Sequence, residues 1–174
     1  MKGEKVSIII PVYNASLFLS DTIKTIQNQT YDNWEAIFVN DCSKDDSVSI
    51  IKKAQKKDKR IILLENDKNS GAAITRNNGI KYATGRYICF LDADDLWNKN
   101  KLKKQLKFMD ERKSAFSFTG YEFANSDGIP NGKKVFVPSK INYRQALKNT
   151  TIWTSTVMLD TSILKKENIY ICQT

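Results

Sequence analysis

The chain has 174 residues, of which 41% are hydrophobic and 27% charged, and a net charge of +9 from 28 basic and 19 acidic side chains. This length and composition are typical of one globular domain that can bury a core. Histidine is absent, and the cysteines are Cys42, Cys89 and Cys172, widely spaced. These counts argue against a disulfide framework, a Cys/His zinc site and any catalytic triad that uses histidine.

No stretch is long and apolar enough to predict a membrane span, and Pro11 ends the apolar run from Val6 to Ile10 too early for a signal peptide. We therefore expect a cytoplasmic protein. The basic surface favours nucleic acid, anionic lipid headgroups or a phosphorylated substrate, or it is simply solvated lysine.

The first half of the chain alternates apolar runs with amphipathic segments joined by short connections. We expect a helix that Ser16 caps and that ends near Asn28. The pattern predicts a parallel sheet with helices on both faces, an α/β fold. The expected strands are Val6 to Val12, Trp34 to Val39, Arg60 to Leu64 and Tyr87 to Leu91, and the other expected helices are Ser47 to Lys57 and Ala72 to Ala83.

The second half predicts an antiparallel or mixed arrangement. It begins with a lysine-rich helix whose inner face is Leu102, Leu106 and Met109, with the lysines on its outer face. The elements expected after it are a strand from Ser114 to Ala124, a returning strand from Lys134 to Val137, a short helix from Asn142 to Lys148, a strand from Ile152 to Leu159 and a helical turn from Thr161 to Lys166.

Acidic residues follow directly on the buried strand Tyr87 to Leu91, in the order Asp92, Ala93, Asp94, Asp95. Burying these carboxylates together would be costly, so we expect them at the carboxyl edge of the sheet, where α/β proteins bind ligands. Carboxylates at alternate positions can converge on a divalent cation that also holds phosphate oxygens. The alternative is that the acids cap the next helix.

Other polar residues are expected at the same edge. Asp41 follows a strand and can accept hydrogen bonds from a base or a ribose, or can serve only as a turn residue. Arg76 can contact phosphate near a helix start, or pair with Asp41 or Asp92. The chain has neither of the glycine-rich dinucleotide and P-loop motifs, which disfavours both kinds of site.

Aromatic and hydroxyl side chains near the acids have two readings each. Trp34 and Trp97 are core or rim aromatics, although Trp97 is close enough to the acids to cover a bound sugar. The hydroxyls from Thr154 to Thr156 either satisfy the sheet or, in a cleft, hydrogen-bond a sugar.

Four stretches in order resemble family 2 glycosyltransferases with the GT-A fold: Ile8 to Asn14, Val39 to Ser47, Asn69 to Gly79 and Ala83 to Asp95. The resemblance is strong over residues 5–112 and looser over residues 116–163. It implies a single GT-A domain over residues 1–174, a Rossmann-like α/β/α sandwich with a nucleotide-binding half (1–112) and a partial acceptor half (113–174). The ending suggests a cut inside a larger protein.

This resemblance implies inverting transfer from a nucleotide sugar, usually a UDP-sugar, to a hydroxyl of a saccharide or lipid-linked saccharide in bacterial surface polysaccharide or lipopolysaccharide synthesis. Peripheral association with an anionic membrane fits the basic surface; nucleic acid is not an expected partner. By position, the nucleotide-sugar site would contain Pro11, Tyr13, Asn14, Asp41, Arg76, Asp92, Ala93 and Asp94, with Asp94 and Asp92 as ligands of Mn²⁺ or Mg²⁺.

The sequence departs from the family in one respect, because family members carry a later acid that acts as the catalytic base. After Thr156 the only acids are Asp160 and Glu167, and neither stands in that motif. We therefore expect the base beyond Thr174, and donor binding with poor transfer. The alternatives are a nucleotidyltransferase, a non-catalytic nucleotide-sugar-binding module and, on charge alone, a nucleic-acid-binding domain.

Overall fold

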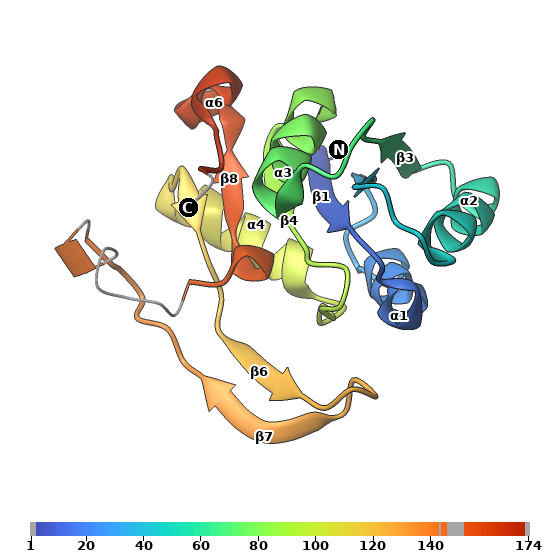
Figure 1. Cartoon of the computed structure of the whole chain (residues 1–174). Helices are drawn as coiled ribbons and strands as arrows, with labels where there is room; N and C mark the ends of the chain where they lie inside the picture. The colour runs from blue at the N-terminus through green and yellow to red at the C-terminus, as the bar shows by residue number, and fades with distance from the viewer. Residues whose placement is uncertain (1–2, 143, 146–151, 173–174) are drawn as a thin grey trace.

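The computed structural model describes residues 3–142, 144–145 and 152–172. Its main sheet has six strands in the order β3-β2-β1-β4-β8-β5 (Figure 1). Strands β3, β2, β1 and β4 are parallel, and β8 runs antiparallel to both of its neighbours, so the predicted mainly parallel sheet is confirmed. The strands are β1 (Val6–Val12), β2 (Trp34–Asn40), β3 (Ile61–Glu65), β4 (Tyr87–Phe90), β5 (Phe116–Ser117) and β8 (Met158–Asp160).

Helices cover both faces of this sheet. Successive β1 residues point to opposite faces, so Ile8 and Ile10 pack against α1, α2 and α4, whereas Ile9 packs on the side of α3 and α6. The helices are α1 (Ser16–Gln27), α2 (Ser47–Lys57), α3 (Gly71–Tyr82), α4 (Lys101–Arg112) and α6 (Thr161–Leu164), with short 3₁₀ turns η1 (Thr154–Thr156) and η2 (Lys166–Asn168). Within the described residues, no helix is long and apolar enough to cross a membrane.

Three strand predictions in the second half were wrong in extent. The returning strand expected from Lys134 to Val137 begins earlier and ends earlier, at Pro130 and Val135. The segment from Ser114 to Ala124 divides into β5, in the main sheet, and β6 (Tyr121–Ala124), which pairs with β7 (Pro130–Val135) in a separate two-stranded sheet. The break falls at Gly120, whose backbone lies so close to Val135 that a Cβ there would be 2.7 Å from the Val135 carbonyl oxygen.

The predicted strand from Ile152 to Leu159 is instead the turn η1 followed by the short β8. Thr156 explains the turn, because its amide and its hydroxyl both donate to the Trp153 carbonyl and draw the chain out of an extended conformation. Asn142 and Gln145 exchange the hydrogen bonds of a capping box. Arg144 and Gln145 are helical, and residues 143 and 146–148 of the helix predicted from Asn142 to Lys148 lie outside the described residues.

The start of α1 is held by another loop rather than by its own residues. Ser16 is not the N-cap; that position belongs to Ala15, which has no capping side chain. The free amides of Ala15 and Ser16 donate to Ser47 Oγ (3.0 Å) and Asp45 Oδ2 (2.9 Å) of the segment that leads into α2. Burial would raise the pKa of Asp45, but hydrogen bonds from Ser47 and Ser16 outweigh it and lower the pKa. The loops after β1 and β2 are thus locked together at the carboxyl edge.

Lysines of α4 mostly face solvent as predicted, with one exception. Leu102 and Met109 are buried on the inner face and Leu106 packs against the core, while Lys103 and Lys104 are exposed. Lys101 Nζ is buried 3.8 Å from the centre of the Trp97 ring, and desolvation lowers its pKa to about 8.

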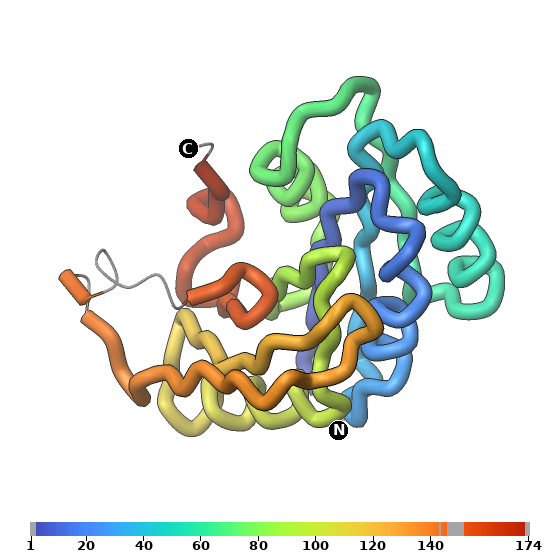
Figure 2. The backbone as a smooth tube through the Cα atoms, turned by 60° about the horizontal axis from the view of Figure 1, so that its bottom comes forward, coloured from blue at the N-terminus to red at the C-terminus, as the bar shows by residue number. Residues whose placement is uncertain are grey.

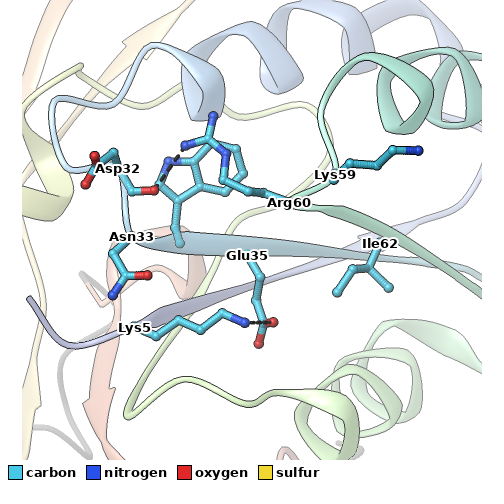
Figure 3. A pocket seen from close by; sticks show the side chains of 8 residues that line it. Lys5, Asp32, Asn33, Glu35, Lys59, Arg60 and Ile62 are labelled. Carbon is cyan, nitrogen blue, oxygen red and sulfur yellow. Dashed lines mark hydrogen bonds and ion pairs between the residues drawn. The ribbon is translucent and has the colours of Figure 1, made fainter. Parts of the chain in front are cut away.

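At the amino edge of the sheet, Glu35 is a buried carboxylate at the centre of a hydrogen-bond network, and Figure 3 shows its contact with Lys5. It accepts from Lys5 Nζ at 2.5 Å, from Ser7 Oγ at 2.6 Å and from the Thr84 amide at 2.7 Å, so it joins β1, β2 and the connection into β4. Nearby, the Arg60 guanidinium lies 3.7 Å from the centre of the Trp34 ring, and Trp34 is a core residue as predicted.

We expect Glu35→Gln to lower the free energy of unfolding at pH 7 by about 2 kcal/mol, because charge-assisted hydrogen bonds are lost. Burial would raise the pKa of Glu35, but hydrogen bonds from Lys5, Ser7 and Thr84 hold it below its ordinary value. A depressed carboxylate pKa stabilises the fold above the unfolded-state pKa, and this stabilisation is lost as pH falls toward the folded-state pKa. The free energy of unfolding, measured with urea, should therefore fall more steeply below about pH 4.5 in the wild type than in Glu35→Gln.

The control is Glu65→Gln, which removes the charge of an exposed residue paired with Lys52 across 3.5 Å. That change should alter stability by less than about 0.5 kcal/mol. Equal losses in the two variants would show that the Glu35 network contributes nothing specific.

Candidate functional site

The acids after β4 form a short turn at the carboxyl edge of the sheet, which we call the acid loop (Asp92–Asp95). Strand β4 holds its start, because the Leu91 amide donates to the Ile9 carbonyl at 3.0 Å on central strand β1. The Asp95 amide donates back to the Asp92 carbonyl at 3.1 Å and closes the turn. The predicted position of these acids, beyond the end of a buried strand, is confirmed.

Two side chains that the sequence did not single out for this purpose hold the acid loop in place. Thr22 on α1 donates its hydroxyl to the Ala93 carbonyl at 2.8 Å, and Ser155 Oγ in η1 accepts from the Asp92 amide at 2.9 Å. Thr22 is a fully buried polar residue on the apolar face of α1, and that exception to the apolar pattern is the signal that could have found it.

Trp97 anchors the loop rather than covering a sugar. Its ring is only 8% exposed, and its indole Nε1 donates to the Ser155 carbonyl at 2.9 Å. The Ser155 hydroxyl also accepts from the Asp92 amide, so of the two roles weighed for it, a structural contact or a contact with a sugar, the structure shows the structural one. The interpretation of Trp97 as a core aromatic is confirmed, and the suggestion that it covers a bound sugar was wrong.

Arg76 and Asp92 form an ion pair across the two sides of the edge. Arg76 Nη2, on α3, lies 2.5 Å from Asp92 Oδ1, and the two side chains are 13% and 30% exposed. The predicted ion pair is confirmed with Asp92 rather than with Asp41. Within the described residues, the buried Arg76 Nε has no hydrogen-bond partner. Direct contact of Arg76 with a ligand stays a prediction.

The remaining acids concentrate negative charge on the open side of the loop. Asp94 is exposed to solvent, and Asp95 is partly buried behind it. Burial raises the pKa of Asp95, the nearby charges of Asp92 and Asp94 add to the shift, and a hydrogen bond with Ser155 opposes it. Such a site favours a bound cation, which would relieve the repulsion.

Asp41 lies at the same edge but is engaged in capping α3. One oxygen accepts from the Ser70 amide at 2.9 Å and from Asn66 Nδ2 at 2.8 Å, and the other accepts from the Gly71 amide at 2.8 Å. The residue is 3% exposed. The turn role weighed for Asp41 therefore takes a specific form, an N-terminal helix cap contributed by a distant strand. Contact with a base stays a prediction.

The predicted nucleotide-lining residues after β1 also lie at this edge. Tyr13 is 55% exposed, and Asn14 adopts a left-handed conformation with φ 50°. The Asn14 side chain accepts from the Lys44 amide at 2.8 Å and ties the loops after β1 and β2 together. The last register pair between β1 and β4 joins Ile9 to Phe90, and Pro11 lies beyond it. Pro11 has no N–H to donate, and at this position the β1–β4 pairing loses no hydrogen bond because of it.

The acids late in the chain lie elsewhere. Asp160 pairs in register with Tyr87 at the amino end of β4, accepts from Arg86 Nη2 at 2.8 Å and caps α6 through the Ser162 amide. Burial would raise its pKa, but hydrogen bonds from Arg86 and Ser162 lower it. Glu167 lies in η2 beside Lys166, whose Nζ donates to the Lys81 carbonyl at the end of α3. Neither acid is placed at the acid loop.

The oxygen ligands of the acid loop meet part of what a hard divalent cation requires. Among the residues that the structure describes, no group of three or more His, Cys, Asp or Glu is arranged to hold a metal by itself. Mg²⁺ and ions like it are commonly held by one or two carboxylates plus substrate phosphates, and one or two carboxylates are what the acid loop offers. Oxygen ligands without Cys or His favour Mn²⁺ or Mg²⁺ over zinc.

Comparison with known proteins decides the family. The family model described as "Glycosyl transferase family 2" matches residues 7–169, nearly the whole chain. The chain belongs to glycosyl transferase family 2. The resemblance drawn from the four sequence stretches is thereby confirmed.

Two of the relatives to which the chain is similar come from bacteria. The chain is 47% identical over 155 residues to TuaG of Bacillus subtilis (strain 168), whose name assigns it to teichuronic acid biosynthesis. It is 42% identical over 159 residues to WfgD of Escherichia coli, named UDP-Glc:alpha-D-GlcNAc-diphosphoundecaprenol beta-1,3-glucosyltransferase. The matches cover 89% and 91% of this chain but only 62% and 61% of those relatives.

A solved family structure has the same fold. The crystal structure of S. aureus TarS in complex with UDP superimposes with a TM-score of 0.76 at 26% identity, over 95% of this chain and 49% of that one. The GT-A fold predicted for the chain is therefore confirmed.

Proposed function

We propose that this chain binds a UDP-sugar and a divalent cation at the acid loop, as the donor-binding part of an inverting glycosyltransferase. The observation that carries the proposal is an exposed carboxylate, Asp94, at the carboxyl edge of the sheet, next to Asp92 and Arg76. Support comes from WfgD, which is named as a UDP-glucose-dependent enzyme, and from TarS, which was crystallised with UDP. We assign residues 1–112 to the donor half of a single domain and 113–174 to part of the acceptor half.

In this proposal the residues at the carboxyl edge have different roles. Asp94 is open to solvent and would hold Mn²⁺ or Mg²⁺ together with Asp92, while Arg76 orients Asp92 and offers positive charge to phosphate. The bound metal would neutralise charge on the diphosphate as it leaves. Thr22 and Ser155 prevent the loop from moving, so the carboxylates are placed before the ligand arrives.

The nucleoside would lie toward β1 and β2. Exposed Tyr13 can pack on a base, and Pro11 and Asn14 shape the floor beside it. A hydrogen bond from the base to Asp41 would involve the same carboxylate that caps α3. Nucleotide binding would therefore be coupled to the position of that helix.

The acceptor in this proposal is a saccharide, free or lipid-linked, in bacterial cell-surface polysaccharide synthesis, as the names of TuaG and WfgD suggest for those proteins. A net charge of +9 fits contact with an anionic membrane at its cytoplasmic face, where a lipid-linked acceptor would be presented. Because Asp160 and Glu167 lie away from the acid loop, neither is assigned as the catalytic base.

The test is calorimetric titration of the protein with UDP, with Mn²⁺ and with EDTA. Asp94→Ala is expected to weaken Mn²⁺-dependent UDP binding about tenfold, which corresponds to about 1.4 kcal/mol. The fold should be unaffected, because Asp94 is exposed.

Asp110→Ala serves as the matched control, since it removes an exposed acid from α4 and should leave UDP affinity unchanged. A UDP affinity that does not depend on Mn²⁺, or an equal loss of UDP affinity in the two variants, would rule out a metal ion at the acid loop. Salt-sensitive binding to oligonucleotides without UDP affinity would favour the nucleic-acid alternative.

A further inference from the structure

Aromatic side chains gather where hairpin β6–β7 joins the main domain. The Tyr121 ring lies with its centre 5.7 Å from that of Trp153 at an angle of 57°, and 5.6 Å from that of Phe123 at 70°. Tyr121 and Phe123 are two positions apart on β6, so their rings share one face of the hairpin. We call Tyr121, Phe123 and Trp153 the aromatic corner.

Trp153 is the exception among the tryptophans of the chain. Trp34 and Trp97 are 2% and 8% exposed, whereas Trp153 is 50% exposed. Its carbonyl oxygen shapes η1, but that contact needs only the backbone. A half-exposed indole leaves a large apolar ring face in water, and such a face gains free energy when a ligand covers it.

The aromatic corner lies beside the acid loop. Trp153 precedes Ser155 by two residues, and Ser155 Oγ accepts directly from the Asp92 amide at 2.9 Å. Two residues span at most about 7 Å, so the Cα atom of Trp153 lies within about 7 Å of the Cα atom of Ser155, which contacts the acid loop.

The far end of the hairpin returns to the same region. A Cβ on Gly128, in the turn between β6 and β7, would lie 2.8 Å from Leu96 Cδ1, just after the acid loop. The hairpin lies at the end of the molecule toward which β1 runs, and in the tilted view it crosses in front of the segment that follows β4 (Figures 1 and 2). The turn of the hairpin therefore lies against the residue that follows the acid loop, and the other end of the hairpin carries the aromatic corner.

We propose that Trp153 and Tyr121 form a stacking subsite for a pyranose ring of the acceptor saccharide. The inference rests on the proposed function, because an acceptor hydroxyl must reach a donor sugar held at the acid loop. The C–H face of a pyranose is apolar and slightly positive, and it packs on the negative face of an aromatic ring. The tilted Trp153–Tyr121 pair offers two ring faces in a corner, which suits one sugar ring.

Position favours a saccharide over a lipid surface as the occupant. The corner lies beside the backbone of the acid loop, where a donor sugar would meet its acceptor, and its rings are partly covered by each other rather than projecting outward. The more exposed Phe136, at 86%, follows β7 and lies outside the corner. Lipid binding is therefore an outcome that the experiment must distinguish.

The test uses intrinsic fluorescence of the 174-residue protein, because collisional quenching by acrylamide reports mainly on exposed Trp153. Methyl glycosides of N-acetylglucosamine, glucose, galactose and mannose are added at up to about 100 mM, a range that detects affinities near the 1 mM level. Each is added with and without Mn²⁺ and UDP. At least one glycoside should lower the quenching constant about twofold, and saturation-transfer NMR should place its ring protons against the indole.

Variants assign the effect to the stacking face. Trp153→Phe should weaken glycoside affinity only a few-fold, since a ring is kept, while Trp153→Ala and Tyr121→Ala should weaken it about tenfold in NMR titrations. Tyr82→Ala is the matched control, because Tyr82 is 62% exposed at the far end of α3, and it should change nothing.

UDP affinity separates this inference from the proposed function. All of these variants should bind Mn²⁺ and UDP as the wild type does; absence of UDP binding in the wild type would refute the proposed donor site instead. If UDP binds but no glycoside protects the indole, or if phosphatidylglycerol vesicles protect it and glycosides do not, the saccharide subsite is overturned.

Discussion

Asp41→Ala is expected to lower the free energy of unfolding by about 3 kcal/mol. The substitution removes both oxygens that receive the Ser70 and Gly71 amides at the start of α3 and the Asn66 side chain. These donors are partly buried, so water can replace the lost acceptor only in part. The negative charge at the amino end of the α3 dipole is lost as well.

A helix start that loosens should also disturb the donor site. Arg76, on α3, is the partner of Asp92, and the pair holds the acid loop toward the helix. UDP affinity of Asp41→Ala should therefore fall together with its stability, whether or not Asp41 touches the base.

Asp46→Ala is the matched control, and urea unfolding is the measurement. Asp46 occupies the N-cap position of α2, yet its side chain makes no capping hydrogen bond and is exposed. Its loss should change stability by less than about 0.5 kcal/mol. A comparable decrease for both aspartates would mean that the buried cap contributes no more than an ordinary surface charge.

Gly85→Ala is expected to cost about 3 to 4 kcal/mol and to leave little soluble protein. A Cβ at this position would lie 2.6 Å from the Lys5 carbonyl oxygen and 2.8 Å from the Ser7 amide nitrogen. Both atoms belong to backbone at the start of β1, which is hydrogen-bonded to β2 on one side and β4 on the other. Neither atom can give way without breaking a ladder of the sheet.

Gly132→Ala provides the comparison, with thermal unfolding as the readout. Gly132 has φ of 85°, so alanine there is conformationally strained, but no atom lies within 4 Å of the added Cβ. That strain should cost only about 1 kcal/mol. If Gly85→Ala proved as mild as Gly132→Ala, the close approach of the two backbones would not be what requires glycine at position 85.

Much of the carboxyl edge of the sheet was predictable, because it depends on the local order of residues along the chain. The apolar run from Tyr87 to Leu91, bounded by Gly85 and by acids, favours a buried strand, and the cost of burying carboxylates favours a place for them at its open end. The second half was harder, because β5 and β8 have only two and three residues and exist through pairing with distant partners. Short apolar segments of this kind have no period long enough to identify them.

The amino-acid sequence by itself determined the parallel α/β half, the family and the edge at which the acids gather, since apolar periodicity and motif order are written along the chain. Only the tertiary structure decided which partner each polar side chain takes. It paired Arg76 with Asp92 rather than Asp41, placed Asp41 at the start of α3, and made Ser155 and Trp97 anchors of the acid loop. The physical reason is that a buried polar atom gains free energy by hydrogen-bonding to a group that the fold brings within about 3 Å, and that group often comes from another part of the chain.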